Sequence, residues 1–140
     1  MNILILAPFE QTCLQTLRMH AEVTYENWME SQRLYAPEEL TAKINERDIT
    51  ALIVEADFVL EDTFEEAKGL KLVGICRNAT DHIDLNAASQ NGVTVVNSPG
   101  RNSKAVAELV IGLMFSLSRR IPAAHMYVTE HKWENPISPY

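Results

Sequence analysis

The segment "CRNATDHIDL" at residues 76–85 combines more reactive and hydrogen-bonding groups than any other part of this sequence. It follows an apolar run and precedes a short stretch of helical character. Successive backbone N–H groups in a tight loop can point toward one spot and bind an anion. We therefore expect residues 77–80 to form an anion-binding loop.

Two aspartates in the same segment have simpler structural roles. Asp84 stands directly before the helical stretch, where an aspartate commonly caps the first N–H groups. We expect Asp81 to stabilise the turn by accepting hydrogen bonds from backbone N–H groups. The set Asp81, His82 and Asp84 does not have the spacing of a known metal site, so no metal is expected.

The four histidines are interpreted as surface or capping residues and not as proton carriers. One is in the first helical stretch, one in the loop and two in the C-terminal tail: His20, His82, His125 and His131.

The elements that position this loop are predicted strands and helices that alternate along the chain. Five short runs read as strands, at residues 2–7, 22–27, 51–56, 70–75 and 93–97. Helical stretches lie between them, at residues 10–20, 37–48, 61–69 and 84–92, and Gly92 is a natural left-handed end for the last of these. The strands are apolar throughout, without alternating polar residues, which indicates burial on both faces. They are separated by helices along the chain, which indicates a parallel sheet. We predict an α/β fold, a flavodoxin-like doubly wound five-stranded parallel sheet followed by a long apolar helix.

Ligands of such sheets bind beyond the carboxyl ends of the strands. This rule selects four loops, at residues 8–10, 55–58, 77–81 and 97–102.

The long helix is predicted over Ser103–Ile121. Between Ala105 and Leu117 its only charge is Glu108, so it is apolar on nearly every side and must be covered by other protein. We expect residues 1–100 to form one domain, and residues 101–140 to form this helix and a linker. The uncovered helix predicts a homodimer.

Composition excludes several classes of function. The net charge is -7 and the only adjacent basic pair is Arg119-Arg120, so a nucleic-acid surface is not expected. The apolar part of the long helix is too short for a bilayer, and the N-terminus does not resemble a signal peptide. Cys13 and Cys76 are read as free thiols, and the protein is expected to be cytoplasmic.

The segment "LVGICRNATDHIDLNAASQNGVTVVNSPGRNSKAVAELVIGLMFSLSRRI" resembles the first part of the NAD-dependent D-2-hydroxyacid dehydrogenases, the family of phosphoglycerate dehydrogenase. The resemblance is specific from Leu70 to Ile121 and weaker over residues 1–69. It implies hydride transfer between a small 2-hydroxy or 2-keto acid and NAD or NADP. It also implies that the catalytic Arg, Glu and His belong to a nucleotide-binding domain outside these 140 residues. None of the five glycines are separated by a single residue, so G-x-G-x-x-G is absent.

The resemblance also implies roles for individual residues. The backbone N–H groups of Asn78, Ala79 and Thr80 are expected to bind the substrate carboxylate. Asn102 matches an asparagine that faces substrate or cofactor, although its position also suits a helix N-cap. The long helix is expected to be shared between the nucleotide-binding domain and a second subunit.

Two sites depart from the family pattern. Arg77 and Ala79 stand where glycines are usual; Ala79 allows fewer backbone conformations, and Arg77 either adds a charged contact or points to solvent. Glu55-Ala56 stands where phosphoglycerate-type members tend to have Arg-Ser. A carboxylate at Glu55 repels phosphate, which argues against 3-phosphoglycerate. Glu55 either accepts hydrogen bonds from hydroxyl groups of a neutral polar substrate or only faces water.

Two alternatives to an enzyme remain. A receiver domain needs an acidic pair after the first strand and a Lys after the fifth. The sequence has Pro8-Phe9-Glu10 and Asn97-Ser98-Pro99 there, which argues against a receiver domain. A non-catalytic module that binds a small acid or only dimerises fits the same sequence, and the residues do not separate it from half of an enzyme.

Overall fold

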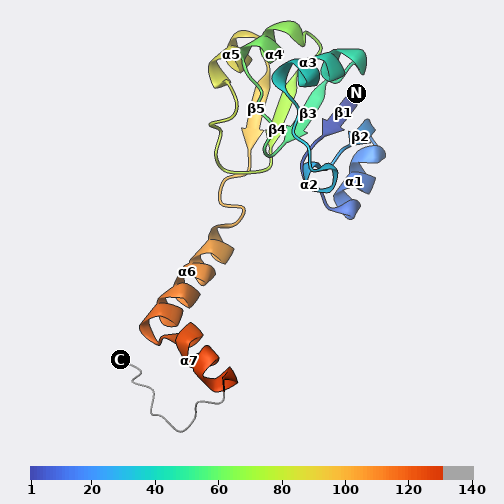
Figure 1. Cartoon of the computed structure of the whole chain (residues 1–140). Coiled ribbons are helices and arrows are strands. Elements are labelled where there is room, and N and C mark those ends of the chain that lie inside the picture. Colours follow the sequence, from blue (N-terminus) through green and yellow to red (C-terminus); the bar gives the residue numbers. More distant parts are fainter. Residues whose placement is uncertain (131–140) are drawn as a thin grey trace. The chain divides into compact units, whose positions relative to one another are not determined.

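The computed structural model describes residues 1–130 and divides the chain into two compact units, Met1–Pro99 and a second unit that begins at Gly100. The first unit is built on a sheet of five parallel strands in the order β2-β1-β3-β4-β5 (Figure 1). These strands are β1 (Asn2–Ile5), β2 (Glu22–Tyr25), β3 (Ala51–Val54), β4 (Leu72–Ile75) and β5 (Thr94–Asn97). The strand order is that of a flavodoxin-like doubly wound sheet, as predicted.

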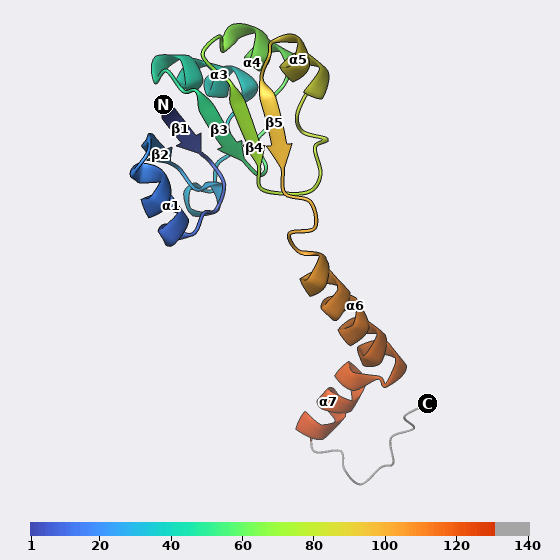
Figure 2. The ribbon, with the colours of Figure 1, turned by 180° about the vertical axis from the view of Figure 1, so that it is seen from behind.

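Helices cover the two faces of this sheet unequally. The first unit contains α1 (Gln11–Arg18), α2 (Trp28–Ser31), α3 (Pro37–Glu46), α4 (Glu61–Glu66) and α5 (Leu85–Gln90). Figures 1 and 2 show α3, α4 and α5 over one face, and α1 lies on the other beside β1 and β2. The predicted helix at 84–92 ends as expected, with Gly92 at φ 69° directly after the Asn91 cap.

Alternate residues of the central strands enter two separate apolar clusters, which explains why these strands show no polar alternation. Leu4, Leu52 and Val73 belong to the larger cluster, under α3, α4 and α5. Ile3, Ile5 and Ala51 belong to the smaller one, with Leu14 of α1. Both clusters are fully shielded from water at their centres, as a parallel sheet requires.

The second face is not fully covered by the helices of this unit, although the sequence predicted a sheet buried on both faces. Val96 of β5 pairs in register with Gly74 and so points to the α1 side, where it is 50% exposed. One eight-residue helix is too narrow to extend across five strands.

The second unit contains two helices, α6 (Ser103–Ser118) and α7 (Ile121–Thr129). The predicted long helix therefore ends three residues early. Arg120 adopts a left-handed conformation, φ 50°, and Pro122 begins a new helix in its first turn. All of α6 is exposed apart from the half-buried Ser116.

Within residues 1–130, no helix combines the length and apolar character needed to cross a membrane.

Candidate functional site

The loop after β4 is fastened at several points to the carboxyl edge of the sheet. The Arg77 carbonyl accepts a hydrogen bond from the Ser98 N–H group at 3.2 Å, and the Asn78 carbonyl accepts one from the Asn97 side chain at 2.8 Å. Farther along, the Ile83 N–H group donates to the Thr80 carbonyl at 3.0 Å. The carbonyl groups of the loop are thus used to hold it against the end of β5.

Three consecutive N–H groups in the middle of this loop have no hydrogen-bond partner among residues 1–130. In the part of the chain that the structure describes, the amides of Asn78, Ala79 and Thr80 donate to no backbone or side-chain acceptor. Asn78 and Ala79 are exposed and Thr80 is half-buried. Three consecutive donors at the ligand-binding edge of a doubly wound sheet can receive an anion.

Ala79 causes no backbone strain in this loop. The residues with positive φ in the described chain are Gln32, Asp48, Arg120, Gly92 and Gly100, and none is in the loop. A glycine is therefore not required at Arg77 or Ala79, because both adopt φ values open to any residue.

Arg77 makes a charged contact within the chain, while its predicted contact with the substrate stays a prediction. Its Nη2 lies 3.0 Å from Asp81 Oδ1 and 2.7 Å from His82 Nδ1. Among residues 1–130 no backbone N–H group of the turn donates to the Asp81 side chain, so the prediction that it bonds these groups is wrong. The guanidinium, four residues away, competes for its carboxylate.

His82 is buried, so its interpretation as a surface or capping residue is also wrong. Its side chain is 2% exposed, and the Phe58 ring meets it edge to face with centroids 6.4 Å apart. Burial and then the positive charge of Arg77 lower the pKa of His82 below its ordinary value. The neutral ring accepts from Arg77 at Nδ1, so its proton lies on Nε2.

The remaining histidines and Asp84 agree better with expectation. Asp84 Oδ1 accepts from the Ala87 N–H group at 2.9 Å and caps α5, which confirms the predicted cap. His20 and His125 are exposed. His131 lies outside the described residues.

Glu55 is held by a residue of the short helix α2. Trp28 Nε1 donates to Glu55 Oε2 at 3.1 Å, and Glu55 is half-buried at the end of β3. The segment before α2 continues along β1, since the Trp28 N–H group donates to the Leu6 carbonyl. The sequence did not predict α2, because four residues give no helical period.

Asp57 is a buried carboxyl group on the same edge that sequence reasoning did not single out. Its side chain accepts from the Tyr35 N–H group at 2.9 Å, while Oδ2 has no partner among the described residues. Burial raises the pKa of Asp57 above its ordinary value, although hydrogen bonds from the backbone oppose the shift. The sequence feature that could have identified Asp57 is its position directly after the apolar run at residues 51–56.

Asn102 occupies the N-cap position of α6, but its side chain makes no capping hydrogen bond. The predicted cap is therefore wrong at the level of the side chain. Ser103 instead donates its hydroxyl to the Gly100 carbonyl at 2.9 Å.

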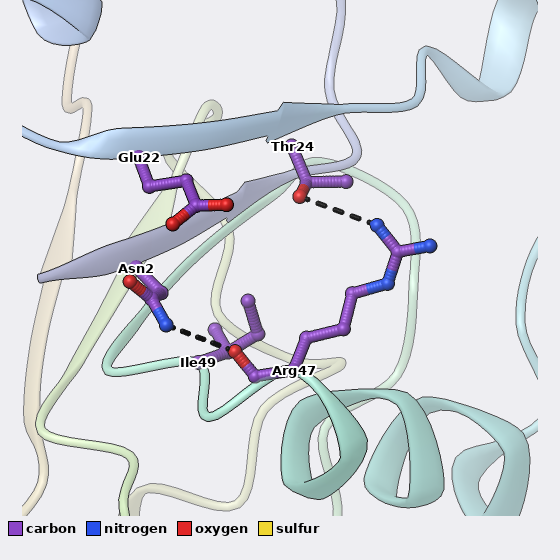
Figure 3. A pocket seen from close by; sticks show the side chains of 5 residues that line it. All are labelled: Asn2, Glu22, Thr24, Arg47 and Ile49. Atoms are coloured by element: carbon purple, nitrogen blue, oxygen red, sulfur yellow. Dashed lines mark hydrogen bonds between the residues drawn. The ribbon is translucent and has the colours of Figure 1, made fainter.

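A hollow of about 280 Å³ lies at the opposite edge of the sheet, where β1 and β2 begin. Figure 3 shows Asn2, Glu22 and Thr24 around it, with Arg47 reaching across to Thr24 Oγ1 at 3.4 Å. The hollow lies near the amino ends of β1 and β2, whereas the loop after β4 lies at the carboxyl ends of the strands, so the two are separate. No three His, Cys, Asp or Glu side chains among residues 1–130 are grouped to hold a metal ion.

The loop after β4, with its three free amides, lies at the carboxyl ends of the strands in a flavodoxin-like sheet, and comparison with known proteins identifies the family of this chain. The profile of the family "D-isomer specific 2-hydroxyacid dehydrogenase, catalytic domain" matches residues 3–135. The chain belongs to this family. It corresponds to part of that family's proteins, because it spans 24–40% of the length of the relatives described next.

Two curated relatives and one solved structure illustrate the relationship. YoaD of Bacillus subtilis is 33% identical over 136 residues, which is 96% of this chain and 40% of YoaD. The D-3-phosphoglycerate dehydrogenase of Archaeoglobus fulgidus is 33% identical over 136 residues, 96% of this chain and 24% of that protein. The NAD⁺-bound 3-phosphoglycerate dehydrogenase of Entamoeba histolytica is 26% identical with a TM-score of 0.66, over 85% of this chain and 39% of that one.

Proposed function

We propose that this chain is the substrate-binding half of an enzyme that interconverts a D-2-hydroxy acid and its 2-keto acid. The observation that carries the proposal is the row of free amides at Asn78, Ala79 and Thr80, in a chain of the D-2-hydroxyacid dehydrogenase family. These amides hold the substrate carboxylate by hydrogen bonds to its oxygens. Charge-assisted bonds of this kind are stronger than neutral ones.

NAD or NADP accepts or supplies the hydride when it is bound. The 140 residues contain no G-x-G-x-x-G, so a nucleotide-binding domain must be supplied from outside them. The residues of this half bind and orient the acid. Asn102, just before α6, is proposed to face the substrate or cofactor, which is consistent with a side chain that makes no capping bond.

The substrate is proposed to be an acid without a phosphate group. Glu55, half-buried at the end of β3, places a carboxylate on the same edge as the loop. Glu55 Oε2 accepts a hydrogen bond from Trp28 Nε1 at 3.1 Å, which fixes the position of this carboxyl group. A negative charge there disfavours a phosphorylated tail and leaves acceptor capacity for a hydroxyl group.

We also propose that the chain forms a homodimer through α6. Its large apolar side chains are 48–80% exposed: Val106, Leu109, Val110, Ile111, Leu113, Met114, Phe115 and Leu117. Exposed apolar patches of this kind mark protein interfaces.

A dehydrogenase assay tests the enzyme proposal. The 140-residue chain with NAD(H) and a panel of 2-hydroxy and 2-keto acids is expected to give no turnover. The longer polypeptide that contains these residues and a G-x-G-x-x-G is expected to be active. Turnover by the 140-residue chain contradicts the proposal that this half only binds the substrate. An inactive longer polypeptide favours a non-catalytic acid-binding module.

A further inference from the structure

The side chain of Arg77 spans the loop whose amides are free. It begins at the end of β4 and reaches Asp81 and His82, so residues 78–80 lie between the two ends of this bridge. Its Nη2 donates to both partners at once, at 3.0 and 2.7 Å. The loop is thereby closed by a side chain, in addition to its backbone contacts with β5.

The two partners of Arg77 differ in how firmly they hold it. Asp81 is 80% exposed, and an ion pair in water contributes little. His82 is 2% exposed, packed against Phe58, and its carbonyl accepts from the Val59 N–H group at 3.0 Å. A buried acceptor with a fixed ring fixes its donor more strongly than a mobile surface carboxylate.

The buried ring has one proton arrangement compatible with this contact. Arginine is always a donor, so His82 Nδ1 must accept and the ring must be neutral. The lowered pKa of His82 agrees with that state. His82 Nε2 and Arg77 Nε have no partner among the described residues, so the Nδ1 contact is the hydrogen bond that joins these two side chains.

We propose that Arg77 and His82 are positioning residues, whose hydrogen bond holds the amides of residues 78–80 in the arrangement that receives the substrate carboxylate. This inference rests on the proposed function of those amides. The bond acts without touching the substrate itself, by limiting the conformations of the loop before binding.

The test measures the affinity of the 140-residue chain for oxamate, a 2-keto-acid analogue, by NMR titration. His82→Leu keeps an apolar ring-sized volume and removes the acceptor, and Arg77→Met keeps the stem and removes the donor. Each is expected to weaken oxamate binding about tenfold, the usual effect of losing a hydrogen bond to a charged group. His82→Asn, whose Oδ1 can replace Nδ1 as acceptor, is expected to stay within about threefold of the parent.

Combining the two changes separates positioning from a direct charge effect of Arg77. If both residues act through one bond, the double variant binds oxamate no more weakly than either single variant. His20→Leu is the matched control on an exposed histidine and should leave affinity unchanged. The thermal midpoints of all variants are recorded, so that loss of folding in His82→Leu is distinguished from loss of binding. If His82→Leu does not fold, the affinity of Arg77→Met for oxamate decides whether the hydrogen bond has the positioning role.

The possible outcomes are distinct. Parent-like affinity in Arg77→Met and in folded His82→Leu overturns the positioning role while leaving the amide site intact. If the double variant loses affinity by the product of the two single losses, the positioning role is overturned, and Arg77 instead contacts the ligand directly. No oxamate binding by the parent overturns the proposed function itself.

Discussion

Ala79 lies in the middle of the three free amides, and proline at this position removes one N–H group. We expect Ala79→Pro to reduce the affinity for oxamate at least about tenfold, because one charge-assisted hydrogen bond is lost. Ala79→Gly keeps the amide and should bind nearly as the parent does. Asn78→Ala should also have little effect, since the chain holds Asn78 by its carbonyl oxygen. Equal affinity of the proline variant and the parent excludes the amide site.

A substitution of Glu55 tests which class of acid the site binds. Replacing its carboxylate by a guanidinium, Glu55→Arg, should improve the affinity for phosphorylated 2-hydroxy acids about tenfold if this residue faces the substrate tail. Glu55→Gln serves as the control that removes charge without reversing it. Competition titrations with 3-phosphoglycerate measure the change, and an unchanged affinity places Glu55 outside the site.

The buried imidazole of His82 makes stability depend on pH. Its pKa in the folded protein is lowered, first by burial and then by Arg77, so folding disfavours the protonated ring. The free energy of unfolding should therefore be highest above the ordinary pKa of about 6.5 and fall as pH decreases toward the lowered value. His82→Asn should flatten this part of the curve in urea titrations between pH 7.5 and about 5.5. An identical slope in parent and variant contradicts this account.

Local rules predicted the role of one site residue, the helix cap Asp84. Asp84 caps α5 because its acceptor and the Ala87 N–H group are three residues apart. Arg77, Asp81 and His82 are also close in sequence, yet their roles were missed or left open. Whether His82 is buried depends on the packing of Phe58, which no local pattern encodes.

At the scale of elements, a charged cluster ties β2 to α3 and to the segment that precedes it. Lys43 Nζ lies 2.7 Å from Glu26 Oε2 and 2.8 Å from the Tyr35 hydroxyl, which itself donates to Glu26. Burial alone raises the pKa of Glu26, but the hydrogen bonds from Lys43 and Tyr35 outweigh it and lower the pKa. The cluster fixes the chain that carries the Tyr35 N–H group to Asp57.

Glu26→Gln should destabilise the fold by about 1–2 kcal/mol at pH 7, because two hydrogen bonds to a charged group are weakened. The contribution is present above the unfolded pKa of about 4.5 and is lost as pH falls through the lowered folded pKa. Parent and variant should therefore converge in acid. Exposed Glu30→Gln is the control, and urea unfolding is the measurement. A variant as stable as the parent at pH 7 contradicts the role assigned to Glu26.

The five strands were predictable because their apolar, β-branched runs have few alternative structures. Their ends were not, since each strand ends or begins two residues or fewer from the prediction, and the composition of the run does not change at that point. The helix α2 was missed because its start is set by the Asn27 side chain, which accepts from the Met29 N–H group, and not by an apolar period. Asn102 shows the opposite error, a residue suited to capping that does not cap.

At the scale of the whole molecule, the exposure of α6 predicts self-association. Burying one of its large apolar side chains contributes roughly 1.5–3 kcal/mol, and several together exceed the entropic cost of dimerising. We expect a homodimer at tens of micromolar in sedimentation equilibrium. Leu113→Glu should produce monomers that stay folded, whereas Met19→Glu, on an exposed apolar residue of the first unit, should leave the dimer intact. A parent chain that is monomeric and does not bind an apolar dye contradicts this prediction.

The most direct test of the central claim follows the backbone amides themselves. In a ¹H–¹⁵N spectrum of the uniformly labelled chain, increasing oxamate should shift the Asn78, Ala79 and Thr80 amide signals downfield together, as expected when free N–H groups donate to a carboxylate. The amides of Asn2, Glu22 and Thr24, around the hollow at the other edge, should not move. If saturating oxamate leaves the three loop signals in place, or shifts the signals at the other edge instead, the loop after β4 is not the carboxylate site and the account is wrong.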